Sequence, residues 1–190
     1  MHRSTADSRP RDRAGRFPFT CTDCGERHAV ETLFGFPDPD DLHEPVGPAD
    51  RDATGRGLDP AAGAEEDLRR SGVHFYLRGL LPVPLRDRPG AFVWGLWVRI
   101  DPPSALRYRH HLDGGALPAS SPGVLANRLP GYPETRGLPV TLRYEPGPVR
   151  PGIELDRVEH PLVRDQLLGL ADGCAARLAM AVLHGNRRSV

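Results

Sequence analysis

Lysine is absent from this chain, and several other residue types are scarce. All 25 basic residues are arginine, and isoleucine and asparagine occur only twice each. This bias is typical of a very GC-rich genome, so part of the abundance of glycine and proline reflects codon choice rather than disorder. For the same reason, an arginine in this chain is weaker evidence for a bidentate anion contact than it is elsewhere.

An excess of positive charge and a long hydrophobic run are also missing. The 25 arginines are balanced by 25 aspartates and glutamates, whereas dedicated nucleic-acid-binding proteins usually carry a strong basic excess. No apolar run approaches the ~20 residues that span a bilayer. Residues 1–16 lack the apolar segment of a secretory signal. We therefore expect a cytoplasmic protein that binds neither nucleic acid nor membranes.

Cysteine is too scarce for a disulfide framework, and the common catalytic motifs do not occur. The chain contains only Cys21, Cys24 and Cys174, whereas small disulfide-stabilised domains use more. Gly-x-Ser-x-Gly is missing, and no Walker or Rossmann glycine pattern follows an expected strand. The motifs therefore do not indicate a reaction.

The 190 residues suit a single domain with loose ends. We expect a disordered arm at 1–16, one α+β domain at 17–185 and a C-terminal tail at 186–190. Within the domain, residues 37–70 are rich in proline and contain ten acidic and four basic residues. This composition predicts an irregular surface loop, with a helical turn at 64–70.

Alternating hydrophobicity predicts a mainly antiparallel sheet. Strands are expected at 17–20, 29–36, 73–85, 91–100, 123–129, 140–144 and 153–158, with 73–85 and 91–100 paired as a hairpin. Helices are expected from Asp101 to about residue 112, from His160-Pro161 onward, and over 173–184. The order predicts an α+β fold in which helices pack on one face of the sheet and a Cys-x-x-Cys hairpin knuckle lies at the N-terminal end.

The strongest motif is Cys21-x-x-Cys24-Gly25-x-x-His28. Two thiolates at this spacing chelate one Zn²⁺ when the turn between them curls back. Gly25 allows the positive φ that such a turn often needs, and His28 adds a nitrogen ligand. A thioredoxin-type redox pair instead opens a long helix, whereas a strand-like segment follows here. We expect structural zinc, with a redox pair or two unligated thiols at a hairpin turn as the alternatives.

A closed zinc site needs a fourth ligand, which the spacing does not identify. His160 and His184 are candidates, although His160 also suits a helix boundary and His184 a last helical turn. Cys174, His110 and His111 are further possible donors. Three protein ligands and a water would instead form an open site, which favours metal-dependent hydrolysis.

A candidate ligand surface lies around the two tryptophans. Trp94 and Trp97 point to opposite faces of one expected strand, so one enters the core and the other faces a helix, a partner or a groove. Arg78, on the neighbouring strand, can hold an anion or stack on an aromatic ring, and it can equally be a solvated sheet residue. The candidate surface consists of Arg78, Trp97, Asn127 and Tyr132.

Short segments, taken in order, resemble a bacterial family of uncharacterised proteins classed as a domain of unknown function. They are Phe19-x-Cys21-x-x-Cys24-Gly25-x-x-His28, Phe75-x-x-Arg78-Gly79, Phe92-x-Trp94-Gly95-x-Trp97-Val98, the run from Gly123 through Asn127 and Tyr132 to Thr135, Arg150-Pro151-x-Ile153-Glu154-Leu155, and His160-Pro161-Leu162 with Gln166 and His184. The resemblance implies a further cysteine shortly before Phe75, which this chain lacks. The family implies fold and boundaries but no activity.

Three hypotheses follow. The first is a non-enzymatic binding or interaction module, stabilised by the zinc knuckle, whose partner is an unknown protein or small-molecule ligand. The second is a metal-dependent hydrolase with an open site formed by Cys21, Cys24 and His28 or His160. The third is an accessory or immunity-like protein that acts on a protein partner through residues 37–70. We favour the first, because a knuckle of structural type occurs without a catalytic constellation.

Overall fold

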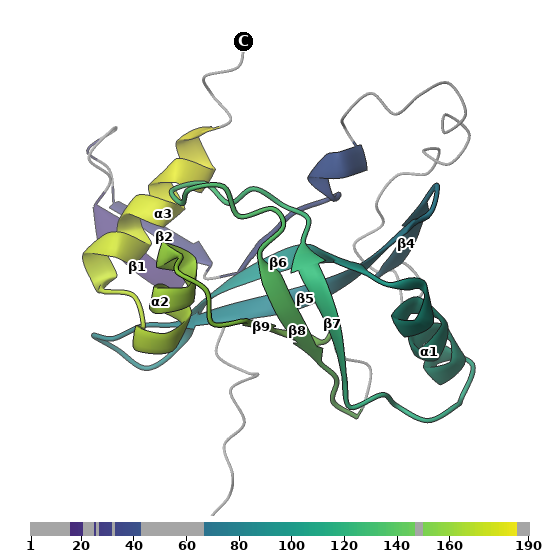
Figure 1. The fold of residues 1–190 in the computed structure, drawn as a ribbon. Coiled ribbons are helices and arrows are strands. Elements are labelled where there is room, and N and C mark those ends of the chain that lie inside the picture. Colours follow the sequence, from purple (N-terminus) through teal and green to yellow (C-terminus); the bar gives the residue numbers. More distant parts are fainter. Residues whose placement is uncertain are drawn as a thin grey trace, which may run out of the picture.

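The computed structural model describes residues 16–20, 25, 27–31, 33–42, 67–146 and 150–185 (Figure 1). The strands are β1 (Arg16–Thr20), β2 (Arg27–Glu31), β3 (Leu33–Gly35), β4 (Leu68–Ser71), β5 (His74–Pro84), β6 (Ala91–Ile100), β7 (Ser120–Leu125), β8 (Pro139–Arg143) and β9 (Gly152–Leu155). The helices are the 3₁₀ helix η2 (Asp40–Leu42), α1 (Pro102–Leu112), α2 (Pro161–Leu168) and α3 (Asp172–Gly185). The expected arm and tail lie outside the described residues, apart from Arg16.

Strands β5 to β9 close into a barrel. Each strand pairs antiparallel with the next, and β9 returns to pair in parallel with β5 at Leu80 and Gly152. A meander of five strands closes in this way because its first and last strands run in the same direction. The amide of Leu80 also donates to the carbonyl of Pro151 at 2.9 Å. The α+β class is confirmed, but the sheet closes into a five-stranded barrel, which the sequence did not predict.

The placement of the helices also differs from the expectation. Helix α1 lies on one side of the barrel, whereas α2 and α3 lie together on the other (Figure 1). A closed barrel leaves no single outer face on which all the helices can pack. Helix α1 follows β6 and precedes β7, whereas α2 and α3 follow β9, so the two groups start from different strands. The prediction of helices on one face is therefore wrong.

The core fills the inside of the barrel, and the hairpin of β5 and β6 supplies much of it. The β6 bounds match the expected 91–100, and β5 pairs antiparallel with β6 along its whole length. Trp94 belongs to the barrel core, whereas Trp97 lies in a second, smaller cluster with Tyr76 and Ala126. Both tryptophans are fully buried. The prediction that they occupy opposite faces is confirmed.

Several expected elements take a different form. The strand expected at 29–36 divides into β2, which pairs with β1, and β3, which pairs in parallel with β6. Residues 68–70 of the expected helical turn form part of β4, which pairs with β5. Val73, the first residue of the strand expected at 73–85, is 77% exposed, because it lies in the turn between β4 and β5. Residues 43–66 lie outside the described part.

Helices α1 and α2 begin where the sequence predicts. The carboxylate of Asp101 accepts a hydrogen bond from the amide of Ser104 at 2.7 Å and caps α1. The Nδ1 atom of His160 accepts from the amide of Leu162 at 3.1 Å and caps α2. Each cap satisfies an amide that has no partner inside the helix. Among the described residues, no helix has the length and apolar character needed to cross a membrane.

Candidate functional site

The expected zinc-knuckle motif lies between β1 and β2 in the sequence. The two strands pair antiparallel, with Thr20 opposite Arg27 and Phe19 opposite His28. Gly25 has a φ of +73°, as the motif requires. Cys21 and Cys24 lie outside the described residues. Among the residues that the structure describes, no group of three or more His, Cys, Asp or Glu side chains is placed to hold a metal ion, so zinc stays a prediction.

The candidate fourth ligands lie at helix ends. His184 falls in the last turn of α3. His160 caps α2 through Nδ1, and its Nε2 atom is buried without a hydrogen-bond partner in the described part of the chain. The structural interpretation of His160 as a helix-boundary residue is therefore confirmed.

The outward side of β5 and β6 carries the residues that the sequence singled out. Arg78 lies opposite Trp97, and Tyr76 lies opposite Arg99, in the register of the two strands. These four side chains, which we call the outer face, point away from the barrel core because successive residues of a strand alternate. Arg78 and Trp97 are thus neighbours on the same side of the sheet, as a shared ligand surface requires.

Residues 36–42, which we call the strap, cross the outer face after β3. The amide of Phe36 donates to the carbonyl of Gly95, and the amide of Asp40 donates to the carbonyl of Ala126, both at 2.9 Å. The indole Nε1 of Trp97 donates to the carbonyl of Phe36 at 3.2 Å. The strap therefore covers Trp97 and explains why this residue is fully buried on the outside of the barrel.

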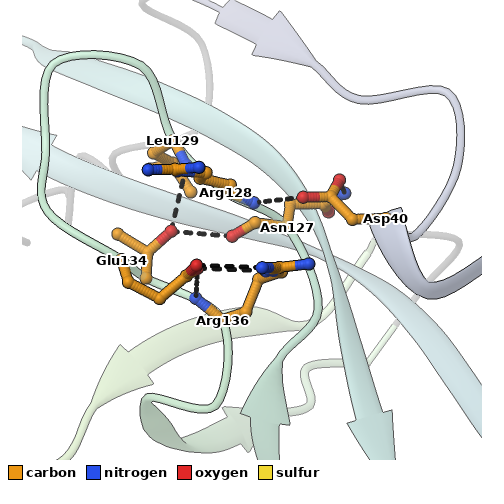
Figure 2. A network of polar contacts seen from close by, with 7 residues as sticks. Asp40, Asn127, Arg128, Leu129, Glu134 and Arg136 are labelled. Carbon is orange, nitrogen blue, oxygen red and sulfur yellow. Dashed lines mark hydrogen bonds and ion pairs between the residues drawn. The ribbon is translucent and has the colours of Figure 1, made fainter. Parts of the chain in front are cut away.

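Asn127 holds the strap onto the barrel (Figure 2). Its Oδ1 accepts from the amide of Trp97 at 2.8 Å, and its Nδ2 donates to the carbonyl of Asp38 at 2.8 Å and to Oδ1 of Asp40 at 3.0 Å. The other carboxylate oxygen of Asp40 accepts from the amide of Arg128 at 2.7 Å. Asn127 is fully buried. An amide side chain fits this position because it supplies one acceptor and two donors.

Thr135 connects the same network to the loop between β7 and β8. Its hydroxyl donates to the carbonyl of Asn127 at 2.7 Å and accepts from the amide of Leu129 at 3.0 Å. Thr135 is fully buried. On either side of it, Glu134 and Arg136 form an ion pair at 2.9 Å on the surface (Figure 2). The contacts with Arg136, followed by the proximity of Arg128, lower the pKa of Glu134 to about 2.

Arginines gather over the indole ring of Trp97. The guanidinium of Arg69 lies 4.9 Å from the ring centroid, and that of Arg78 lies 5.8 Å from it. Arg69 forms an ion pair with Asp38 of the strap. Contacts of this kind are favourable because the ring face carries negative electrostatic potential.

A third arginine lies close to this pair. The Nε atom of Arg150 donates to both carboxylate oxygens of Asp67, at 3.0 Å and 2.9 Å. Asp67 is buried, and its backbone carbonyl accepts from the amide of Arg78 at 2.8 Å. Arg69 and Arg150 are therefore each paired with an aspartate.

Arg78 differs from both neighbours. Its Nε atom is buried without a hydrogen-bond partner, and no described carboxylate forms an ion pair with its guanidinium. Burial lowers the pKa of Arg78, and the proximity of Arg150 and Arg69 lowers it further, while Asp67 and Asp38 act in the opposite direction. A partly buried cation without an anion is unfavourable unless a ligand supplies one.

A comparison with known protein families supports the family resemblance that was expected from the sequence. Residues 20–170 match the family described as uncharacterised proteins conserved in bacteria, DUF2199. The chain belongs to the DUF2199 family. No curated protein and no solved structure shows significant similarity to it. The DUF2199 description names no activity, so a function can be inferred only from the arrangement of the residues.

In this DUF2199 protein, the four residues of the candidate ligand surface do not all lie together. Arg78, Trp97 and Asn127 lie together beneath or beside the strap. Tyr132 lies elsewhere, where its hydroxyl donates to Oδ2 of Asp165 in α2 at 3.0 Å. Burial raises the pKa of Tyr132, and the carboxylate of Asp165 raises it further. The structure thus places Tyr132 at a contact between a loop and a helix.

The carboxylates of the strap were not predicted as functional residues. Asp38, Asp40 and Asp41 contact Arg69, Asn127 and Tyr76 respectively, residues that are distant in the chain. The sequence does not distinguish these three aspartates from their neighbours, because they lie in an acidic segment without hydrophobic periodicity. Asp67 lies in the same segment and was missed for the same reason, whereas Arg150 was noted only as part of the family resemblance.

Proposed function

We propose that this protein is a cytoplasmic, non-enzymatic binding module that holds a small oxyanion, a carboxylate or a phosphate group, at Arg78. The observation that carries the proposal is the partly buried guanidinium of Arg78, which has no acidic partner among the described residues. Its two neighbouring arginines are paired with Asp38 and Asp67. Among the residues that the structure describes, three arginines against two aspartates leave one positive charge for a ligand to neutralise.

The surroundings of Arg78 favour an oxyanion ligand. A guanidinium presents a rigid fork of donors that matches carboxylate and phosphate oxygens. The ring of Trp97 supports one side of the fork, and Asn127 and the strap fix that ring in place. Because Trp97 and Asn127 are fully buried, they position the site, while Arg78 makes the ligand contact.

Gly35 provides the space in which the guanidinium lies. A Cβ atom at this position of β3 would be only 2.8 Å from Nη2 of Arg78. Glycine is therefore the residue that leaves the guanidinium unobstructed next to the strand. This fit supports a site built for Arg78 rather than a solvated sheet residue.

Calorimetric titration tests the proposal with inorganic phosphate and with citrate as probes. We expect the unmodified protein to bind at least one probe and Arg78→Met to bind it about ten-fold more weakly or worse, since a charge-assisted contact contributes about 1.5–3 kcal/mol. Arg157→Met is the matched control, because Arg157 is exposed and distant in sequence from the site. Absence of binding to both probes, or equal binding by Arg78→Met, contradicts the proposal.

We also propose that the knuckle binds one structural zinc ion through Cys21, Cys24 and His28. The support is the motif itself, the pairing of β1 with β2 on either side of it, and the positive φ of Gly25. His160 and His184 stay candidates for the fourth ligand. Elemental mass spectrometry of protein purified without chelator is expected to find one zinc per chain, and none in Cys24→Ser. Folded protein without zinc contradicts this proposal.

A further inference from the structure

A second polar site lies beside the strap, in an open cavity of about 350 Å³. It is bounded by η2, β6, the end of β7 and the turn at residues 134–137. Its lining residues are Asp41, Arg99, Leu125, Glu134, Arg136 and Gly137. Neither Arg78 nor any of the arginines over Trp97 belongs to this lining. The cavity is therefore separate from the oxyanion site proposed above.

Charges of both signs alternate around this cavity. On one wall, Nη1 of Arg99 lies 3.8 Å from Oδ2 of Asp41, which also accepts from the hydroxyl of Tyr76 at 3.2 Å. On the other wall, Nη2 of Arg136 lies 2.9 Å from Oε2 of Glu134. The Arg99–Asp41 pair is at the outer limit of an ion pair, so both groups have room for another partner of opposite charge.

The walls of the cavity are held by buried groups. Asp40, next to Asp41, is fixed by Asn127 and by the amide of Arg128 (Figure 2). Thr135, between Glu134 and Arg136, is fully buried and hydrogen-bonded on both sides. The charged side chains thus project from backbone that is set before a ligand arrives, which reduces the ordering that binding requires.

We propose that this cavity binds a small zwitterion, a molecule with one ammonium and one carboxylate group, of the size of an amino acid or a dipeptide. A ligand with a single charge would bring that charge against a like charge of the lining. A zwitterion instead sets its carboxylate against Arg99 and its ammonium against Asp41, the two groups that have room for another partner. The volume is at the small end of the range of ligand pockets, ~300–1,000 Å³.

Calorimetric titration with each common amino acid and with alanylalanine tests the proposal. We expect at least one of these probes to bind, and its N-acetylated and C-amidated forms to bind about ten-fold more weakly or worse, because each lacks one charge. Absence of binding by every probe overturns the proposal. Equal binding of the blocked and unblocked forms overturns it as well.

Variants of the lining residues test whether the zwitterion binds in this cavity. Arg99→Gln and Asp41→Asn are each expected to weaken binding of that probe by about ten-fold or more, with Arg143→Gln as the control. Arg143 is exposed and pairs with Glu154 on a different part of the barrel. Because Asp41→Asn also alters the strap, Arg99→Gln is the deciding variant. Unchanged binding by folded Arg99→Gln overturns the proposal, whereas Arg78→Met is expected to bind the zwitterion normally.

Discussion

Asn127 connects β6 and the strap through one side chain. It bonds the backbone of β6 at Trp97, the backbone of the strap at Asp38 and the carboxylate of Asp40. Asn127 and the neighbouring residues of the outer face have different roles. Trp97 and Asn127 are buried and hold the strap, whereas Arg78 is only partly buried and its guanidinium has no ion-pair partner among the described residues. A substitution at each of these residues should therefore affect a different property.

Replacing Asn127 with alanine should reduce stability. The amide of Trp97 and the carboxylate of Asp40 would each lose a partner, and a buried unsatisfied group costs about 1–3 kcal/mol. We expect the free energy of unfolding of Asn127→Ala, measured by urea denaturation, to fall by about this amount. Ser120→Ala, at an exposed position of β7, is the control and should unfold like the unmodified protein. Equal stability of Asn127→Ala would show that the network does not hold the strap.

Replacing Gly35 with alanine should reduce anion binding without unfolding the protein. The new Cβ would displace Nη2 of Arg78, which lies at the end of a flexible side chain and can move. We expect the affinity of Gly35→Ala for the oxyanion probe to fall by about ten-fold while its urea midpoint stays near that of the unmodified protein. An unchanged affinity would mean that the position of the guanidinium is unimportant.

The sequence predicts part of this site. Strand alternation places Arg78 on the polar face of its strand and the two tryptophans on opposite faces of the next strand, but it leaves open which tryptophan faces outward. The contacts of Asp38 and Asp40 with Arg69 and Asn127 span 31 and 87 residues. No sequence pattern near the strap predicts these contacts, because its residues have no hydrophobic periodicity. The contacts form only where the folded strap packs against the barrel.

At the scale of elements, local signals located the central hairpin and two helix starts. The bounds of β6 match the expectation, and Asp101 and His160 cap α1 and α2. The division of 29–36 into β2 and β3 was not predicted, because an apolar run does not show that its two halves join different sheets. The strand β4 was missed because its side chains are mostly polar.

The cap of α1 predicts a pH dependence. Hydrogen bonds from Ser104 lower the pKa of Asp101, so its contribution is fully present above the ordinary carboxyl range and is lost as the pH falls through the lowered value. We expect Asp101→Ala to reduce the free energy of unfolding by about 1 kcal/mol at neutral pH. The difference should shrink in acid, as measured by urea denaturation over a pH series.

Asp101→Asn is the control for this effect. Asparagine also caps helices but does not titrate, so this variant should keep most of the stability at every pH. A difference between Asp101→Ala and the unmodified protein that is as large in acid as at neutral pH would contradict the ionised cap.

At the scale of the whole molecule, closure of the barrel is the feature that the sequence does not reveal. Its parallel pair joins Leu80 to Gly152, which lie in the first and last strands of the meander. Hydrophobic alternation specifies which face of a strand is buried but not which strands pair across such a distance. The close approach at Gly79 is the local feature that permits it.

Replacing Gly79 with alanine should weaken the closed barrel. A Cβ atom there would lie 2.8 Å from Cγ1 of Ile153 and 3.0 Å from the carbonyl oxygen of Pro151, both beside the closing pair. Overpacking of this kind costs about 1–3 kcal/mol, which urea denaturation measures. Gly152→Ala is the matched control, because its Cβ would meet no atom closer than 4.0 Å. Equal stability of the two variants would contradict the importance of this contact.

The most direct test of the account is to locate a bound oxyanion. Crystals soaked in selenate, with data collected at the selenium edge, show the position of the anion by its anomalous scattering. We expect a peak within hydrogen-bond distance of the Arg78 guanidinium, next to Trp97, and no such peak in crystals of Arg78→Met. Selenate bound elsewhere on the protein, with none at Arg78, would contradict the oxyanion site.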